Sequence, residues 1–532
     1  MSAVRAQTAG TGHLVRLILR RDRIRLLVWV LGFGALTSVS ALSSKALYDT
    51  PRKIAGYGET VSSSAAGRFM NGRPYDVDNL SGIVSYELSS AAAVVTGLMV
   101  VFLVVRHTRA EEESGRAELL RGGVLGRHAH TVSAVSVAVA ASLAFGVVDA
   151  GLLIATGLDP GGSVLHGASV TGIGLVFTGV AALAAQLTSS ARGALGIAGG
   201  TLGVFFAIRG VGDVNGTFWT WLSPLGWAQA IRPYGDPQWW PVLALLGLAG
   251  AVLLGAGVLT AHRDEGSGLW QARPGRPRAR AGLGTSVGLA LRLQRGLVLG
   301  WLVFLVGMSA LFGSFAGEVE SLVEDNPEMA EIFAAQSGTL VDGFFAYTVG
   351  FMAVITSAFT LASALRLRSE ENDGRAEIVL ARGQSRVGWA VGSLVVTVLA
   401  TLVAFALTGF ASGAAHWLVT GESDRMASLT GAALAQAPAA LLVGAIGVLL
   451  HGAVPRWALL AWVVFGFAML QNYLGGLLQL PDAVAGLSPF WHQPQLPVEE
   501  LALAPGGVLL ALALLAAAAG LWRFRERDLV AH

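Results

Sequence analysis

Long apolar runs without charge alternate with short charged segments along the entire chain. A helix needs about 20 apolar residues to cross a bilayer, and about 17 to 25 are tolerated. Runs close to or above this length cover residues 26–42, 88–105, 131–157 (interrupted by Asp149), 165–187, 193–208, 241–261, 296–315, 343–365, 387–418, 429–450, 457–480 and 501–522. The pattern predicts an all-α integral membrane protein with about twelve transmembrane helices.

Composition supports the membrane assignment and excludes several classes of site. Only 13% of the 532 residues are charged, against about 25% in a typical soluble domain. With no cysteine, the chain has neither disulfides nor thiolate metal sites, and its ten histidines lack metal-ligand spacing. The lysines Lys45 and Lys53 do not follow glycine, so a phosphate-binding P-loop is excluded. We therefore expect no catalytic residue, metal or cofactor in this chain, and its net charge of +2 gives no reason to expect a nucleic-acid partner.

The distribution of basic residues predicts the orientation in the membrane. Lysine and arginine are enriched in cytoplasmic loops. If both termini are cytoplasmic, most of the 36 basic residues fall on the cytoplasmic side. The sequence therefore predicts a multi-pass plasma-membrane protein with both termini inside, and the lipid bilayer as its surroundings.

The chain contains an internal repeat with a constant offset of 259 residues. The sequence RAEEESGRAE at 109–118 recurs as RSEENDGRAE at 368–377. Weaker matches relate Arg20, Arg23 and Trp29 to Arg292, Arg295 and Trp301, and the Leu-Ser-Pro segment at 222–224 to that at 487–489. We expect a first six-span half at 1–261, a cytoplasmic linker at 262–286 rich in Arg, Gly and Pro, and a second six-span half at 287–532, the two halves in parallel orientation.

Each repeated motif lies between the second and third spans of its half. Glu112 and Arg116 are four residues apart, as are Glu371 and Arg375, a spacing that allows an ion pair along one helical turn. A glycine follows the acidic pair and is expected to bend or end the helix. Solvated charges of an ordinary cytoplasmic loop are the simplest alternative. That alternative explains arginine but not the repeated glutamates, which favour a docking element for a cytoplasmic partner.

The motif Arg-x-Glu-Glu-x-x-Gly-Arg-x-Glu at this position resembles the coupling-helix region of type-2 ABC exporter permeases. The fused twelve-span form is similar to actinobacterial permeases of the polyketide-antibiotic (tetronasin-like) multidrug exporters. The resemblance implies docking to two copies of a separate ATPase subunit, which would bind ATP and Mg²⁺. The residues that it assigns to ATPase docking are Glu111, Glu112, Gly115, Arg116, Glu118, Glu370, Glu371, Gly374, Arg375 and Glu377. Since Glu113 and Ser114 are replaced by Asn372 and Asp373, the two docking sites are expected to differ.

Arginine and apolar residues also alternate before the first span. In residues 13–25, Leu14, Leu17 and Ile18 can share one helical face and arginines another, which predicts an amphipathic interfacial helix. A plain arginine anchor beside the span is the alternative.

Tryptophan and proline are concentrated at residues 217–240, after the fifth span. Tryptophan favours the headgroup level of a membrane and proline breaks helices, so we expect a broken, partly re-entrant hairpin at the outer leaflet. The resemblance supports a small outer gate there, with an aromatic belt as the alternative. The expected gate residues are Trp221, Pro224, Trp227, Pro489 and Trp491.

A substrate path through the membrane is expected to include the acid at position 149. Asp149 could bind a cation, relay protons or pair with a hydroxyl, and its repeat counterpart is Thr408. Aromatic and sulfur side chains on spans that flank a central path complete the expected set: Phe102, Phe205, Phe206, Phe351, Met352, Phe465 and Phe467.

We expect the chain to be the permease subunit of an ATP-driven exporter of hydrophobic drugs or antibiotics, including polyketides. The alternative is a proton-coupled secondary drug antiporter, and a membrane-embedded enzyme or scaffold is a further one. Under the first hypothesis, charge reversal at both Glu112 and Glu371 is expected to uncouple ATP hydrolysis from transport.

Overall fold

The computed structural model describes residues 7–121, 125–262, 268–270, 277–279, 281–324, 340–478 and 481–528. Over these residues the chain is helical, without strands, and eleven of its helices are long and apolar enough to cross a membrane. The prediction of an all-α integral membrane protein is confirmed. The expected span 457–480 corresponds to α21 (Ala461–Leu478), which is not among the eleven.

The chain divides into two compact units, Met1–Pro274 and Gly275–His532, here called unit 1 and unit 2. Residues 263–267, 271–276 and 280 of the expected linker 262–286 lie outside the described residues. Residues 268–270 belong to unit 1, where the amides of Leu269 and Trp270 donate to the carbonyls of Gln186 and Leu187.

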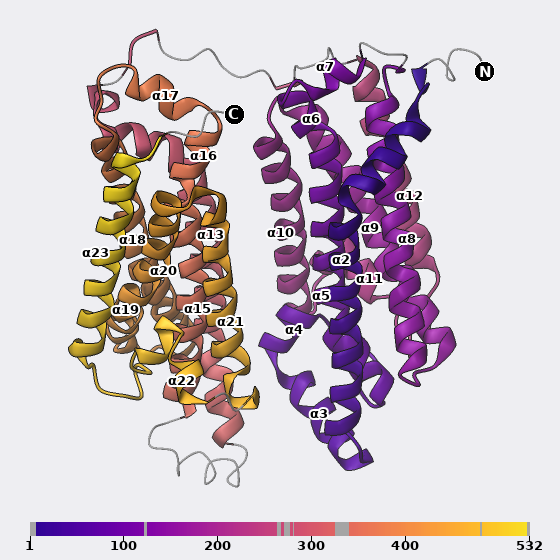
Figure 1. Cartoon of the computed structure of the whole chain (residues 1–532). Helices are drawn as coiled ribbons and strands as arrows, with labels where there is room; N and C mark the ends of the chain where they lie inside the picture. The colour runs from indigo at the N-terminus through magenta and orange to yellow at the C-terminus, as the bar shows by residue number, and fades with distance from the viewer. Residues whose placement is uncertain are drawn as a thin grey trace. The chain divides into compact units, whose positions relative to one another are not determined.

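Unit 1 is a bundle of long helices with several short ones (Figure 1). In chain order its elements are α2 (Thr11–Leu47), α3 (Pro51–Ser63), α4 (Ala65–Asn71), α5 (Leu80–His107), α6 (Arg109–Glu113), α7 (Arg116–Arg121), α8 (Ala129–Ala155), α9 (Pro160–Leu187), α10 (Ala191–Asn215), η1 (Phe218–Leu222), α11 (Pro224–Gln229) and α12 (Trp240–His262).

Helix α9 is at the centre of unit 1 and packs against α5, α8 and α12. Small residues permit this because they let helix backbones approach closely. A Cβ on Gly146 of α8 would lie 2.3 Å from the carbonyl oxygen of Gly167 in α9, and the converse distance is also 2.3 Å. Larger side chains at this crossing would force the two helices apart.

Two pairs of short helices mark the two ends of unit 1. Helices α6 and α7 lie at the end where α2 begins, and α3 and α4 lie at the opposite end (Figure 1). The expected amphipathic segment is not a separate helix, because α2 is continuous from Thr11 to Leu47. Leu14 and Ile18 face the core, whereas Leu17 is exposed.

Unit 2 has a similar order of long and short helices (Figure 1). Its elements are η2 (Ala281–Gly284), α13 (Ser286–Glu324), α15 (Leu340–Ala364), α16 (Arg366–Asn372), α17 (Arg375–Leu380), α18 (Arg386–Thr420), α19 (Arg425–Ala435), α20 (Ala437–Ala453), η3 (Pro455–Leu460), α21, α22 (Asp482–Ala485), η4 (Pro489–His492) and α23 (Leu503–Glu526).

Helices α13 and α18 pack together, as do α20 and α23. The expected span 429–450 is divided between α19 and α20, because Pro438 lacks the amide hydrogen that a continuous helix needs. Gln436 lies at this break and donates to the carbonyl of Pro494. The side chain of Gln436 therefore connects the break between α19 and α20 to the segment before α23.

Candidate functional site

Each repeated motif forms two short helices joined at a glycine. In unit 1, α6 and α7 meet at Gly115, with φ +72°; in unit 2, α16 and α17 meet at Gly374, with φ +69°. We call α6–α7 the first elbow and α16–α17 the second elbow. A left-handed backbone at this point costs a residue with a Cβ about 1–2 kcal/mol. The bend predicted at the two glycines is confirmed.

The first elbow is attached to three long helices of unit 1. The buried guanidinium of Arg109 donates through Nε to the Ala185 carbonyl at the end of α9, at 3.0 Å, and pairs with Glu112 at 2.9 Å. Glu113 accepts from the amide of Ala191, the first residue of α10, and Glu111 pairs with Arg21 of α2. The contacts to Ala185 and Ala191 satisfy open backbone groups at helix ends.

The second elbow is attached through different residues. Glu371 binds Arg527, just beyond α23, at 2.6 and 2.7 Å, and lies 3.3 Å from His451 of α20. Glu370 pairs with Arg366 at 2.9 Å and with Arg375. The hydrogen bonds that Arg375 donates to the Glu370 carboxylate raise the pKa of Arg375. The two elbows share a backbone shape but have different anchors.

The expected i to i+4 ion pairs are replaced by others. Glu112 pairs with Arg109, and Glu371 pairs with Arg527, because the glycine bend separates each acid from the arginine that follows it. The ten proposed docking residues thus divide by exposure. Glu111, Glu370 and Glu371 are buried and fix the elbows, whereas Arg116, Glu118 and Glu377 are exposed. The other four are half-buried: Glu112, Gly115, Gly374 and Arg375.

The second elbow also exposes an apolar residue that the site prediction did not include. Ile378 is 63% exposed on α17, next to Glu377. An aliphatic residue directly after a repeated acidic motif was the sequence feature that could have identified it.

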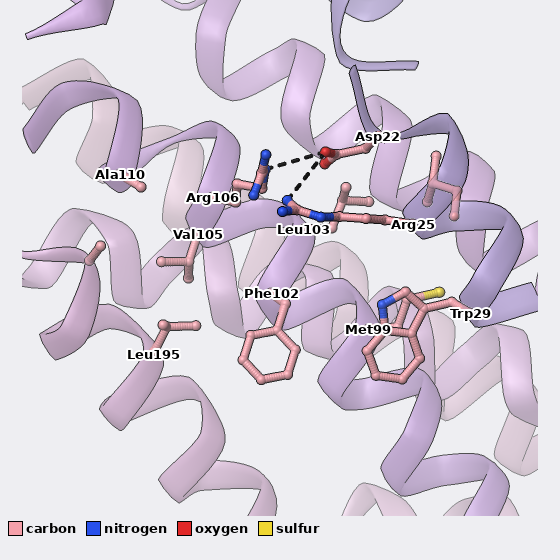
Figure 2. A pocket seen from close by; sticks show the side chains of 12 residues that line it. Asp22, Arg25, Trp29, Met99, Phe102, Leu103, Val105, Arg106, Ala110 and Leu195 are labelled. Atoms are coloured by element: carbon pink, nitrogen blue, oxygen red, sulfur yellow. Dashed lines mark ion pairs between the residues drawn. The ribbon is translucent and has the colours of Figure 1, made fainter. Parts of the chain in front are cut away.

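A cavity of about 390 Å³ opens beside the first elbow, between α2, α5, α6 and α10 (Figure 2). Phe102, expected in a substrate path, lines this cavity and is 47% exposed. Asp22 and Arg106 form part of the same lining, and sequence analysis did not single them out. Asp22, Arg25 and Trp29 lie at positions i, i+3 and i+7 of α2, and Met99, Phe102 and Arg106 have the same spacing on α5. This spacing could have suggested that each set shares one helical face.

Asp149 is fully buried in α8 and hydrogen-bonded on both carboxylate oxygens. Thr37 donates to Oδ1 at 3.1 Å, and Nδ1 of His166 lies 2.6 Å from Oδ2. The far ring nitrogen of His166 lies 3.4 Å from the hydroxyl of Ser89. Of the roles expected for Asp149, the structure displays the pairing with a hydroxyl and adds the histidine.

The other expected path residues lie at separate places within the two units. Phe205 and Phe206 pack against the core of unit 1, where Arg209 lies over the Phe206 ring at 4.6 Å. In unit 2, Phe351 packs with Phe312, and Met352 lines a cavity of about 20 Å³. Phe465 packs edge-on against Trp462, and Phe467 is half-buried.

The expected gate segments are broken chain in both units. Trp221 in η1 stacks on Trp240 at 5.5 Å, its carbonyl accepts from the Trp227 indole, and Pro224 begins α11. Pro489 begins η4, and Trp491 lines a cavity of about 460 Å³ with Gln493. The predicted interruption of the helices is confirmed, whereas a gating role stays a prediction.

Comparison with known proteins identifies relatives over almost the whole chain. The family model described as "Multidrug efflux system permease Rv1217c, C-terminal domain" matches residues 12–262 and 283–525. The multidrug efflux system permease protein Rv1217c of Mycobacterium tuberculosis is 36% identical over 524 residues, which cover 98% of this chain and 95% of that protein. The chain is therefore a multi-pass membrane protein that belongs to the Rv1217c family of multidrug efflux system permeases.

Proposed function

We propose that this chain is the membrane permease of an ATP-driven exporter of hydrophobic, drug-like compounds. Two copies of a separate ATPase subunit hydrolyse ATP and bind the two elbows from the cytoplasm, where both termini of the chain also lie. The name of the M. tuberculosis relative, a permease of a multidrug efflux system, supports drug export.

The division of each elbow into buried anchors and exposed residues is the observation that carries the proposal. Arg109 and Glu371 tie the elbows to the ends of membrane helices, so a force on an elbow is transmitted to the bundle. Arg116 and Glu377 leave charged groups exposed for a partner. This combination of anchored and exposed charges suits a docking element for a cytoplasmic partner.

The lack of a P-loop in this chain supports a separate motor. Neither lysine follows a glycine, so in the proposed mechanism a separate protein supplies the ATP hydrolysis. The division of the system into permease and ATPase agrees with the resemblance of the motifs to type-2 ABC exporter coupling helices.

The test is charge reversal on the exposed faces of both elbows. We expect the variant Arg116→Glu, Glu118→Lys, Glu377→Lys to reach the membrane in normal amounts, lose co-purification with an ATPase that carries Gly-Lys-Ser/Thr, and lose export of rhodamine 6G. Arg52→Glu, an exposed reversal on α3 at the opposite end of unit 1, is the control and should retain both.

Normal ATPase recovery and normal dye export by the elbow variant would refute docking at this surface. Dye export that persists after ATP depletion and stops when the proton gradient is collapsed would instead support the proton-coupled antiporter.

A further inference from the structure

The cavity beside the first elbow has charged lining residues at one end and apolar lining residues at the other. Arg25 and Arg106 meet Asp22 at one end, and Trp29 and Phe102 lie at the other (Figure 2). Its volume of about 390 Å³ falls within the range of pockets that hold small organic molecules. The lining therefore suits a ligand with one polar head and an apolar body.

The charged end has more guanidinium donors than acceptors. Arg25 and Arg106 both face the same oxygen of Asp22, Oδ1, at 3.5 and 3.3 Å. Nε2 of His107 lies 2.5 Å from the other oxygen, Oδ2. Among the residues that the structure describes, no donor completes a hydrogen bond to Oδ1 of Asp22, and no acceptor completes one to Nε of Arg106. An anionic head could supply the acceptors that these two guanidiniums lack.

A cationic head would fit this end poorly. The side chain of Asp22 is 2% exposed and already has three basic neighbours, whereas those of Arg25 and Arg106 are 57% and 34% exposed. A ligand that enters the cavity therefore meets the two arginines before it meets the carboxylate.

The apolar end offers flat and flexible surfaces. Trp29 and Phe102 present aromatic rings, and Met99, Leu103 and Leu195 complete this part of the wall. Burial of an apolar body here would stabilise the bound ligand, and less so when the ligand arrives from lipid.

Unit 2 lacks the same charges at its matching positions. The offset that relates Arg20 to Arg292 puts Gln294 and Leu297 at the positions of Asp22 and Arg25. The motif offset puts Leu365 at the position of Arg106. Gln294 is buried and hydrogen-bonded to Ser393 and Ser363, so this position is polar but uncharged in unit 2.

We propose that the cavity between α2, α5 and α10 binds amphiphilic organic anions, with the carboxylate or phosphate on Arg25 and Arg106 and the apolar body against Trp29 and Phe102. Free amphiphilic acids and anionic lipids share this chemistry. Only the role of such a ligand as exported cargo rests on the proposed function, since the binding experiment contains no ATPase.

The test is equilibrium binding to the full-length chain in phosphatidylcholine nanodiscs at pH 8. The probes are 11-(dansylamino)undecanoic acid and its uncharged methyl ester, followed by dansyl fluorescence. Because hydrogen bonds to charged groups contribute about 1.5–3 kcal/mol, we expect the acid to bind at least about tenfold more tightly than the ester. Equal affinities would overturn the proposal.

Variants with opposite expected effects separate binding from folding. Arg106→Gln and Arg25→Gln should each reduce the preference for the acid, whereas Asp22→Asn should increase it by removing the competing carboxylate. Arg23→Gln, an exposed arginine on the same helix outside the cavity, should leave the preference unchanged. An unchanged preference in both arginine variants and in Asp22→Asn would refute the site.

Competition identifies the source of the anion. Displacement of the dansyl acid by added laurate alone indicates a free amphiphilic acid, and displacement by dioleoyl phosphatidic acid in the nanodisc indicates a lipid. Displacement by neither would overturn the proposal. If the parent chain binds the acid but, together with its ATPase, exports no dye, that result would count against the exporter function and leave the site standing.

Discussion

Arg527 binds both carboxylate oxygens of Glu371, with Nη1–Oε1 and Nη2–Oε2 distances of 2.7 and 2.6 Å. The carbonyl of Arg527 in turn accepts from Arg386, the first residue of α18. One arginine thus connects the second elbow to the end of α23 and to the start of α18, which are far apart in sequence. Two parallel hydrogen bonds between a guanidinium and a carboxylate fix orientation as well as distance.

Glu371→Gln is expected to destabilise unit 2. The side chain of Glu371 is 3% exposed, and removal of one partner of a buried ion pair costs about 3–5 kcal/mol because the other charge stays unpaired. We expect a lower melting temperature of the purified permease by scanning fluorimetry. Glu377→Gln, exposed on the same elbow, is the matched control and should melt like the parent chain. Equal melting of the two variants would contradict an anchoring role.

This burial also changes how charge reversal at Glu112 and Glu371 is understood. Reversal at Glu371 would place a cation beside Arg527 and His451, and loss of folding would accompany any loss of coupling. The exposed set on α7 and α17 therefore tests docking more directly.

Gly374→Ala is expected to strain the second elbow. Space is available for a Cβ, but the φ of +69° is unfavourable for alanine, so we expect a loss of about 1–2 kcal/mol or a reoriented α17. Proteolysis at the elbow and ATPase co-purification measure the two outcomes. Gly300→Ala, at an open helical position in α13, controls for alanine itself. A variant as stable and as well coupled as the parent would show that the bend does not need glycine.

Arg109→Met is expected to loosen the first elbow from α9. The change removes the donors to the Ala185 carbonyl and the Arg109–Glu112 ion pair at 2.9 Å. Hydrogen bonds to charged groups contribute about 1.5–3 kcal/mol each, so the melting temperature should fall clearly. Arg116→Met, on the exposed side of the same elbow, should melt normally and lose only ATPase recovery. The reverse pattern would show that the two roles are assigned the wrong way round.

Asp149→Asn distinguishes the two energy sources. In an ATP-driven exporter Asp149 holds α8 to α2 and α9, so the variant should lose about 1–3 kcal/mol of stability but still export rhodamine 6G when the proton gradient is collapsed at constant ATP. Asp49→Asn, an exposed acid, is the control. Abolished export in a stably folded Asp149→Asn protein, with export by the parent chain also sensitive to the gradient, would favour the antiporter.

Span positions and the two glycine bends could be predicted from sequence because both follow from local properties. An apolar run long enough to cross a bilayer forms a helix whatever its neighbours, since unpaired backbone groups are costly in lipid. Gly115 and Gly374 could likewise be recognised from a repeat around a residue that tolerates positive φ. The helix break at Pro438 follows from the same local chemistry, although the continuous apolar run 429–450 around Pro438 favoured a single span.

Contacts between distant residues were decided only by the tertiary structure. Sequence spacing favoured Glu371 with Arg375, but the bend at Gly374 and the arrival of α23 bring Arg527 to that carboxylate instead. In the sequence, Asp22 is one acid in a segment rich in arginine. Only the packing of α2 against α5 places Arg106 and His107 next to its carboxylate. Helix packing decides which charges are buried as anchors and which stay exposed for a partner. Packing brings together residues that are far apart in sequence, so their spacing along the chain does not predict these contacts.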